Sequence, residues 1–252
     1  MSPEHPSEPT AAPKQPPGRA PALRPLGVRE RQIVGEVLRL YSQGWFPMAE
    51  GPDQAVEWVQ PEERALLPIE PGAFHISRSL RKTLRRTPAE GGFIVRCDTA
   101  FGQVIRACGE PRPGREQTWL SDDIIAIFEL LHAAGIVHSV ECWRPSENLG
   151  PERLVGGVYG LALGGVFAGE SMFSRPELGG TDASKVALVH LVHHVRRRGF
   201  SIFDAQLVNP HLEQFGVYEV PREEYLQRLA TEATREVAWG VFEAGLTVGE
   251  VG

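Results

Sequence analysis

The chain has few cysteines and no long apolar run, and both absences narrow the kind of protein it can be. Its three cysteines, Cys97, Cys108 and Cys142, lie far apart and show no paired spacing. They suggest neither a disulfide framework nor a zinc site, so we expect reduced thiols in the core. No apolar run approaches the roughly 20 residues that cross a bilayer, and membrane insertion is not expected.

The N-terminus lacks the apolar stretch of a secretory signal peptide. Residues 1–26 are instead rich in Pro, Ala and Glu, which predicts a disordered segment on a cytosolic protein. The formal net charge of −6 argues against indiscriminate binding of nucleic acid, so any RNA contact must be local. A chain of 252 residues can form one main domain and a smaller one.

Apolar periodicity and turn residues predict the order of the helices and strands. Helices are expected at residues 28–41, ended by Gly44, and at 76–86. A strand at 93–97 precedes a helix capped by Asp98, and Ser121 caps the next helix at 122–134. The remaining elements are strands at 136–143, 153–161 and 166–173, the last two an antiparallel hairpin, a helix at 182–198 ended by Gly199, a strand at 200–206, a short helix after Asn209, a strand at 217–220 and a helix from 222.

This order predicts an α+β fold, a mixed sheet flanked by helices, that resembles the GCN5-related acetyltransferases. The Pro-punctuated stretch before it predicts a small N-terminal domain at 27–72, followed by a catalytic domain at 73–235 and a C-terminal tail at 236–252. The resemblance implies that the acyl donor lies where two strands separate, here the strands that end at Phe173 and Gln206.

The chain also resembles the leucyl/phenylalanyl-tRNA–protein transferase family over nearly everything from about residue 28 to 225. The segments that carry the resemblance are 169–174, 183–185 and 204–206, with 44–47, 75–79, 100–105, Cys108, Thr118, Trp119, 138–141, Trp143 and 154–160. It implies transfer of leucine or phenylalanine, with methionine a further possibility, from aminoacyl-tRNA to the α-amino group of proteins that begin with Arg or Lys. Such transfer marks the acceptor for degradation. The expected partners are the charged tRNA and these acceptors, and the enzyme is expected to be a monomer.

Three polar residues are the candidate catalytic group. On an extended strand Asp204 and Gln206 point to one face, and the same rule pairs Glu170 with Met172. A lone strand-end carboxylate more often caps a helix or turn, and the family resemblance at all three positions favours the catalytic interpretation. We expect Asp204 to hold the NH₂ of Gln206, whose carbonyl then aligns the attacking amine.

Glu170 is expected either to recognise the Arg or Lys of the acceptor or only to anchor nearby backbone N–H groups. Ser171, Met172 and Phe173 are expected beside it in the substrate pocket. Trp119 matches an aromatic position of the family. Met48 stands where the family places Trp, and a single Trp58 replaces a Trp pair, so we expect adenosine stacking to be either weaker or shared with Trp45. For Trp58 a core role is an equal alternative.

Cations on the helix at 76–86 are the candidate tRNA contacts, because helical spacing groups several of them: Arg78, Arg81, Lys82, Arg85 and Arg86. A solvated charged face is the alternative. His190, His193 and His194 have no metal-ligating partner at suitable spacing, so no metal is expected. The ester bond of aminoacyl-tRNA supplies the driving force, so no cofactor is expected either.

Two other functions stay open. An acetyl-CoA-dependent N-acetyltransferase would use the same cleft, but its pyrophosphate loop needs a glycine-rich turn after the fourth strand. Here Arg175 is followed by Pro176, Glu177 and Leu178, which match that loop poorly. A non-catalytic tRNA-binding module is the second alternative, and the presence of Asp204, Gln206 and Glu170 argues against it.

Overall fold

The structure is a computed structural model that describes residues 24–49, 55–111, 118, 120–146 and 150–246. The segment predicted to be disordered, 1–26, therefore lies outside the described residues up to position 23, and the predicted tail 236–252 is described as far as position 246. Within the described residues, every helix is too short or too polar to span a bilayer.

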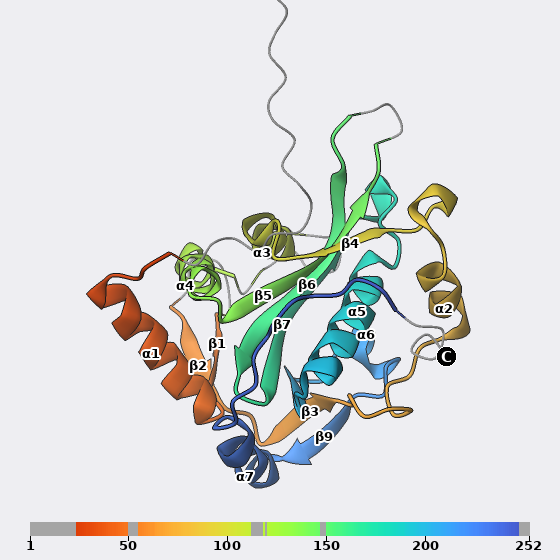
Figure 1. Ribbon diagram of the computed structural model, residues 1–252. Coiled ribbons are helices and arrows are strands. Elements are labelled where there is room, and N and C mark those ends of the chain that lie inside the picture. The colour runs from red at the N-terminus through yellow and green to blue at the C-terminus, as the bar shows by residue number, and fades with distance from the viewer. Residues whose placement is uncertain (1–23, 50–54, 112–117, 119, 147–149, 247–252) are drawn as a thin grey trace, which may run out of the picture.

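A seven-stranded mixed sheet forms the centre of the molecule (Figure 1). Every neighbouring pair of strands is antiparallel except β7 and β8, which run parallel. The β6–β7 pair is the predicted hairpin. In spatial order the strands are β4 (Ile94–Cys97), β5 (Val137–Arg144), β6 (Arg153–Leu163), β7 (Val166–Ser174), β8 (Ile202–Gln206), β3 (Glu63–Leu67) and β9 (Tyr218–Pro221).

Helices cover both faces of the sheet (Figure 1), as the predicted fold class requires. Alternation along β6 illustrates the layering, since Val158 packs toward α5 and its neighbour Tyr159 packs toward α3. One face carries α1 (Val28–Ser42), α3 (Phe101–Gly109) and α4 (Asp122–Ala133), the other carries α2 (Arg78–Leu84), α5 (Ala183–Arg198) and α6 (Pro210–Glu213), and α7 (Arg222–Glu232) packs on β3 and β9.

The predicted caps of two helices are confirmed. The Ser121 hydroxyl accepts a hydrogen bond from the Ile124 N–H at 3.3 Å at the start of α4. Gly199 follows α5 with φ +86°, a backbone conformation that glycine adopts without steric cost. Close packing also needs glycine at Gly156 in β6, because a Cβ there would lie 2.4 Å from the Ala183 Cβ of α5.

The predicted Asp98 cap of α3 is wrong. The α3 N-cap residue is Ala100, and Asp98 has φ +56° and accepts instead from the backbone N–H of Ser139. The carboxylate of Glu141 on β5 accepts the backbone N–H groups of Thr99 and Ala100 at 2.9 and 2.8 Å. Glu141, which is distant in the sequence, therefore accepts the backbone N–H groups just before α3, and no local sequence pattern predicts this contact.

Three strands occur in the segment predicted to be irregular. β1 (Phe46–Met48) and β2 (Glu57–Val59) form a separate two-stranded sheet, whereas β3 lies between β8 and β9 in the main sheet. The division of the chain at residue 72 stays a prediction, although β3 precedes that position and is hydrogen-bonded into the large sheet.

Candidate functional site

The parallel strands β7 and β8 separate part of the way along their length. They pair at three positions, of which Ala168↔Asp204 is the last, and β7 then continues beside β6 as far as Ser174. A cavity of about 310 Å³ opens where they part. It is lined by residues of β7, β8, α5 and α6 that include Gly169, Glu170, Ser171, Met172, Phe203, Ala205, Gln206 and His211. The predicted separation of these two strands is therefore present.

A bulge places Glu170 in this cavity. Tyr159 on β6 pairs with Ser171, but the next residue, Gly160, pairs with Gly169, so Glu170 has no partner across the ladder. An extra residue of this kind bends the strand and redirects its side chain. For this reason consecutive residues of β7, and not only alternate ones, reach the cavity wall.

Gln206 also lines the cavity, but its side chain is placed there by a backbone turn that strand periodicity does not predict. Its φ of +59° is uncommon for a residue with a side chain and ends the extended run of β8. Its Nε2 donates a hydrogen bond to Glu170 Oε1 at 3.3 Å. Asp204 does not share this face, and the expectation that it holds the Gln206 NH₂ is wrong, because the turn at Gln206 breaks the alternation.

Asp204 instead lies behind the cavity wall, only 1 % exposed, with both carboxylate oxygens occupied. Oδ1 accepts from Arg64 Nε at 2.8 Å and from the Gln206 backbone N–H at 2.9 Å. Oδ2 accepts from Arg64 Nη2 at 2.6 Å and from the Tyr225 hydroxyl at 2.8 Å. Asp204 thus holds the backbone of Gln206 rather than its amide side chain.

Glu170 has a different environment. Tyr41 on α1 donates its hydroxyl to Oε1 at 2.8 Å, and in the described part of the chain Oε2 accepts no hydrogen bond. Burial, followed by the nearby Asp204 carboxylate, raises the Glu170 pKa to about 8, while the Tyr41 hydrogen bond and the Arg64 charge act in the opposite direction. This carboxyl group can exchange a proton near neutral pH and would gain from a cation placed beside it.

The predicted substrate residues are divided among several places. Ser171 and Met172 line the cavity, whereas Phe173 is 1 % exposed and packs in the core below α3. Met48 and Trp58 are half-buried in the small sheet, and Trp58 contacts Tyr41, whose ring it meets edge-on at 6.2 Å. Trp119 lies outside the described residues.

The basic helix α2 is shorter than expected and begins at its Ser77 cap, whose hydroxyl accepts the Leu80 N–H at 3.3 Å. Arg78, Lys82, Arg85 and Arg86 are exposed, and Arg81 is half-buried with Nε donating to the Ile76 carbonyl. Leu80 packs in the same cluster as Leu212 of α6, which lines the cavity. The helix α2 therefore packs on the same face of the sheet as α5 and α6, which line the cavity.

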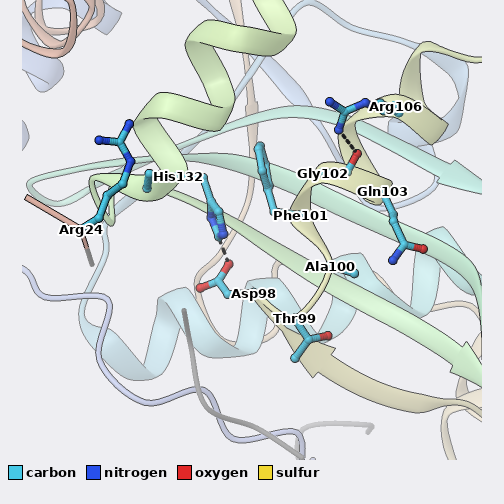
Figure 2. Close-up of a pocket in the computed structure, with 10 residues that line it drawn as sticks. Arg24, Asp98, Thr99, Ala100, Phe101, Gly102, Gln103, Arg106 and His132 are labelled. Carbon is cyan, nitrogen blue, oxygen red and sulfur yellow. Dashed lines mark hydrogen bonds and ion pairs between the residues drawn. The ribbon is translucent and has the colours of Figure 1, made fainter. Parts of the chain in front are cut away.

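A larger cavity, of about 620 Å³, lies where α3 begins and α4 ends. Figure 2 shows His132 facing Phe101, the two rings stacked 4.4 Å apart, with Asp98 beside the imidazole. The charged groups here have partners around the cavity: Asp98 accepts from His138 and Ser139, and Arg106 donates to Gly102 and Glu129. None of the residues predicted for the functional site lines this cavity.

The sequence did not predict three residues that surround the site, Tyr41, Arg64 and Tyr225. Tyr41 was expected only as part of the apolar face of the first helix, and Arg64 lies in a strand that was not predicted. A single buried arginine in a short strand has no local pattern that distinguishes it from a surface cation. Its role follows only from its partner 140 positions away.

The fold and the site together define a class of protein. An α+β sheet in which two parallel strands part over a cavity, with a carboxyl and a carboxamide group inside it, is an acyltransferase domain of the GCN5-related type. The chain belongs to the leucyl/phenylalanyl-tRNA protein transferase family and is an aminoacyltransferase. The model of that family matches residues 68–230, and the model of the family's N-terminal domain matches residues 34–62.

Individual relatives agree over most of the chain. A leucyl/phenylalanyl-tRNA–protein transferase of Paramagnetospirillum magneticum is 50% identical over 213 residues, which cover 84% of this chain and 93% of that protein. The protein of the same name from Chlorobaculum parvum is 45% identical over 204 residues, 81% of this chain and 97% of the relative. One from Phenylobacterium zucineum is 47% identical over 195 residues, 77% and 81% of the two chains.

Proposed function

We propose that this protein transfers leucine or phenylalanine from aminoacyl-tRNA to the N-terminal α-amino group of proteins that begin with Arg or Lys. The observation that carries the proposal is the pair of Gln206 and Glu170, hydrogen-bonded to each other in the cavity between β7 and β8. The relatives bear the name of this activity. We place the enzyme in the cytoplasm as a monomer, where the product would mark its acceptor for degradation.

The reaction needs orientation more than a strong base. An α-amino group has a pKa of about 7.7–8.0, so a useful fraction is neutral near pH 7. Its nitrogen attacks the ester carbonyl carbon, a C–N bond forms, the C–O bond to the tRNA ribose breaks, and the amine proton passes to the departing oxygen. The Gln206 carbonyl oxygen accepts a hydrogen bond from the amine and fixes its direction of approach.

Gln206 keeps its direction through two contacts. Its NH₂ group donates to Glu170, and its backbone N–H donates to Asp204, which holds the unusual φ of the residue. Because the NH₂ is engaged, the amide cannot flip without losing that hydrogen bond. The carbonyl oxygen is therefore the group that is left for the amine.

Glu170 recognises the cation of the acceptor. Its Oε1 is engaged by Tyr41 and Gln206, which leaves Oε2 for an Arg or Lys side chain. A guanidinium or ammonium beside it would lower the pKa from about 8 and keep the carboxylate charged. The exposed cations of α2 contact tRNA phosphates, and Trp119, Met48 and Trp58 contribute to the binding of the aminoacyl-adenosine end.

The rival acetyl-CoA function finds little support at the N-terminus of α5. In that fold the first N–H groups of this helix bind pyrophosphate. Here the Ser184 N–H donates to the Ser174 hydroxyl at 2.9 Å and the Ala183 N–H donates to the Gly180 carbonyl at 3.0 Å. These donors are already used within the protein.

One experiment tests the proposal. The protein is incubated with labelled Phe-tRNA, Leu-tRNA or acetyl-CoA and with a peptide led by Arg, Lys or Ala. We expect label on the Arg- and Lys-led peptides from the two aminoacyl-tRNAs only. Acetylated peptide would favour the acetyltransferase, and tRNA binding without any labelled peptide would favour a non-catalytic tRNA-binding module.

A further inference from the structure

Arg64 is a buried cation that joins an N-terminal strand to the candidate catalytic strand. Its side chain on β3 is 2 % exposed, and its Nε and Nη2 donate to the two oxygens of Asp204 on β8 at 2.8 and 2.6 Å. The third nitrogen, Nη1, donates to the Gly44 carbonyl at 2.9 Å. Such a planar two-point contact fixes the carboxylate in direction as well as in position.

Two aromatic rings hold the guanidinium in place. Its carbon lies 4.7 Å from the centre of the Phe46 ring and 4.5 Å from that of Tyr225, whose hydroxyl also donates to Asp204. Rings on a planar cation favour arginine over lysine, whose ammonium is a point charge without a flat face. Although burial opposes the charged form, Asp204 keeps the Arg64 pKa above its ordinary value.

The orientation of Asp204 has a direct consequence for Gln206. The oxygen that accepts from Arg64 Nε, Oδ1, also accepts the Gln206 N–H at 2.9 Å, and Gln206 has φ +59° at this point. A backbone in this region is costly and persists only where its surroundings hold it. Rotation of the carboxylate would release that N–H, and the amide would lose its direction toward Glu170.

We infer that Arg64 is a positioning residue of the transfer reaction: it fixes Asp204, and through Asp204 it holds the turn that aims Gln206 into the cavity. The inference rests on the proposed function. It gives the N-terminal part of the chain a role in catalysis. The strand β3 supplies the guanidinium, and the Gly44 carbonyl and the Phe46 ring hold that group in place.

Arg64 also balances charge around Glu170. The titratable groups that face Glu170 are Tyr41 from α1, Arg64 from β3 and Asp204 from β8, and His211 from α6 lines the same cavity. Arg64 and Asp204 act on Glu170 with opposite signs. Loss of the Arg64 charge alone would leave Asp204 unopposed and favour the protonated form of Glu170.

The test uses full-length protein with Arg64→Lys, Arg64→Met and Tyr225→Phe, each checked by circular dichroism and tRNA affinity. We expect Arg64→Lys to lower kcat about 10- to 100-fold, the scale of a small misplacement of a reacting group, with tRNA affinity and peptide KM nearly unchanged. Arg64→Met should in addition shift the acidic limb of the kcat/KM profile to higher pH, and the double variant Arg64→Met/Asp204→Asn should shift it back. Tyr225→Phe keeps the guanidinium and should lower kcat only a few-fold.

A matched control is Arg39→Lys, because Arg39 makes the same two-point contact with Glu36 on the exposed face of α1. It should leave kcat unchanged. If Arg64→Met does not fold, Arg64→Lys and Tyr225→Phe still decide. A wild-type kcat in Arg64→Lys, or a loss matched by Arg39→Lys, would overturn the inference.

A crystal structure of Arg64→Lys separates this inference from the proposed function. Movement of Gln206 out of its left-handed conformation would support the positioning role, even if the wild-type protein formed no product from any aminoacyl-tRNA. An unmoved Gln206 in that variant would refute the role, whatever the activity of the wild-type protein proved to be.

Discussion

The two cavities of this protein differ in what their polar groups still lack. The cavity beside α3 is twice as large, about 620 against 310 Å³, but the Asp98, His132 and Arg106 side chains around it are paired with neighbours. The smaller one, between β7 and β8, contains a carboxyl group and an amide, and among the described residues neither Glu170 Oε2 nor Gln206 Oε1 accepts a hydrogen bond. Volume alone therefore does not mark a reactive site, whereas unsatisfied acceptors held in fixed positions do.

The largest expected effect on kcat comes from replacing the glutamine that lines the smaller cavity, and a glutamine of the larger cavity serves as the control. Gln206→Ala should lower kcat for phenylalanyl transfer by about 100- to 1,000-fold, the cost of removing one group aimed at the reacting atoms. Gln103→Ala, in the larger cavity, should leave kcat unchanged. Steady-state transfer to an Arg-led peptide measures both, and similar activities in the two variants would contradict the assignment.

The charge of Glu170 gives the next effect. Glu170→Gln should weaken the binding of an Arg-led peptide by about 10- to 30-fold relative to an Ala-led one, since a hydrogen bond to a charged group is lost.

In the wild type the pKa of about 8 for Glu170 means that the peptide cation must displace a proton at neutral pH, so peptide affinity should rise as the pH approaches 8. Titration calorimetry at pH 6.5 and 8 in buffers of different ionisation enthalpy measures the proton release. A pH-independent affinity in the wild type would argue against this role. The control is Glu129→Gln, because Glu129 on α4 pairs with Arg106 and does not line the cavity between β7 and β8.

The basic helix should affect binding but not chemistry. Replacing Arg78, Lys82 and Arg86 with Gln should reduce the slope of log affinity for tRNA against log salt by about 2, because each phosphate contact contributes about 0.7–0.9. At saturating tRNA, kcat should stay the same. An unchanged slope would show that these residues are an ordinary solvated face.

The smallest effect concerns stability. The folded-state pKa of Glu170 is raised, so its favourable contribution is complete below the ordinary value of 4.5 and is lost as the pH rises through about 8. The wild type should therefore lose about 1 kcal/mol of unfolding free energy relative to Glu170→Gln between pH 7 and 8.5. Urea unfolding at the two pH values measures this difference, and parallel curves would indicate that Glu170 titrates normally.

The parts of the fold that follow from local pattern were predicted well. The helices α4 and α5 have long apolar faces with clear ends at Gly135 and Gly199, and the β6–β7 hairpin has a Gly164–Gly165 turn between alternating strands. In β3, by contrast, Arg64 is buried like its apolar neighbours, and the strand is held by β8 and β9, which follow it by more than 130 residues. No window around it contains those partners.

The sequence predicted that Glu170 and Gln206 lie close together, but it did not predict the contacts that hold them. Resemblance identified Glu170, Asp204 and Gln206, and strand alternation placed the last two side by side. The structure separates them, because Gln206 leaves the extended region and Glu170 occupies a bulge. Long-range contacts hold both residues in these positions. Asp204, which accepts the Gln206 N–H, is itself held by Arg64 and Tyr225, and Glu170 is held by Tyr41.

The most direct test is a crystal structure of the protein with an amide-linked, uncleavable phenylalanyl-adenosine and an Arg-led peptide. We expect the peptide α-amino nitrogen to lie within about 3 Å of Gln206 Oε1, in the cavity between β7 and β8, with the peptide cation beside Glu170. An amine placed away from Gln206, or a peptide bound in the cavity beside α3, would contradict this expectation.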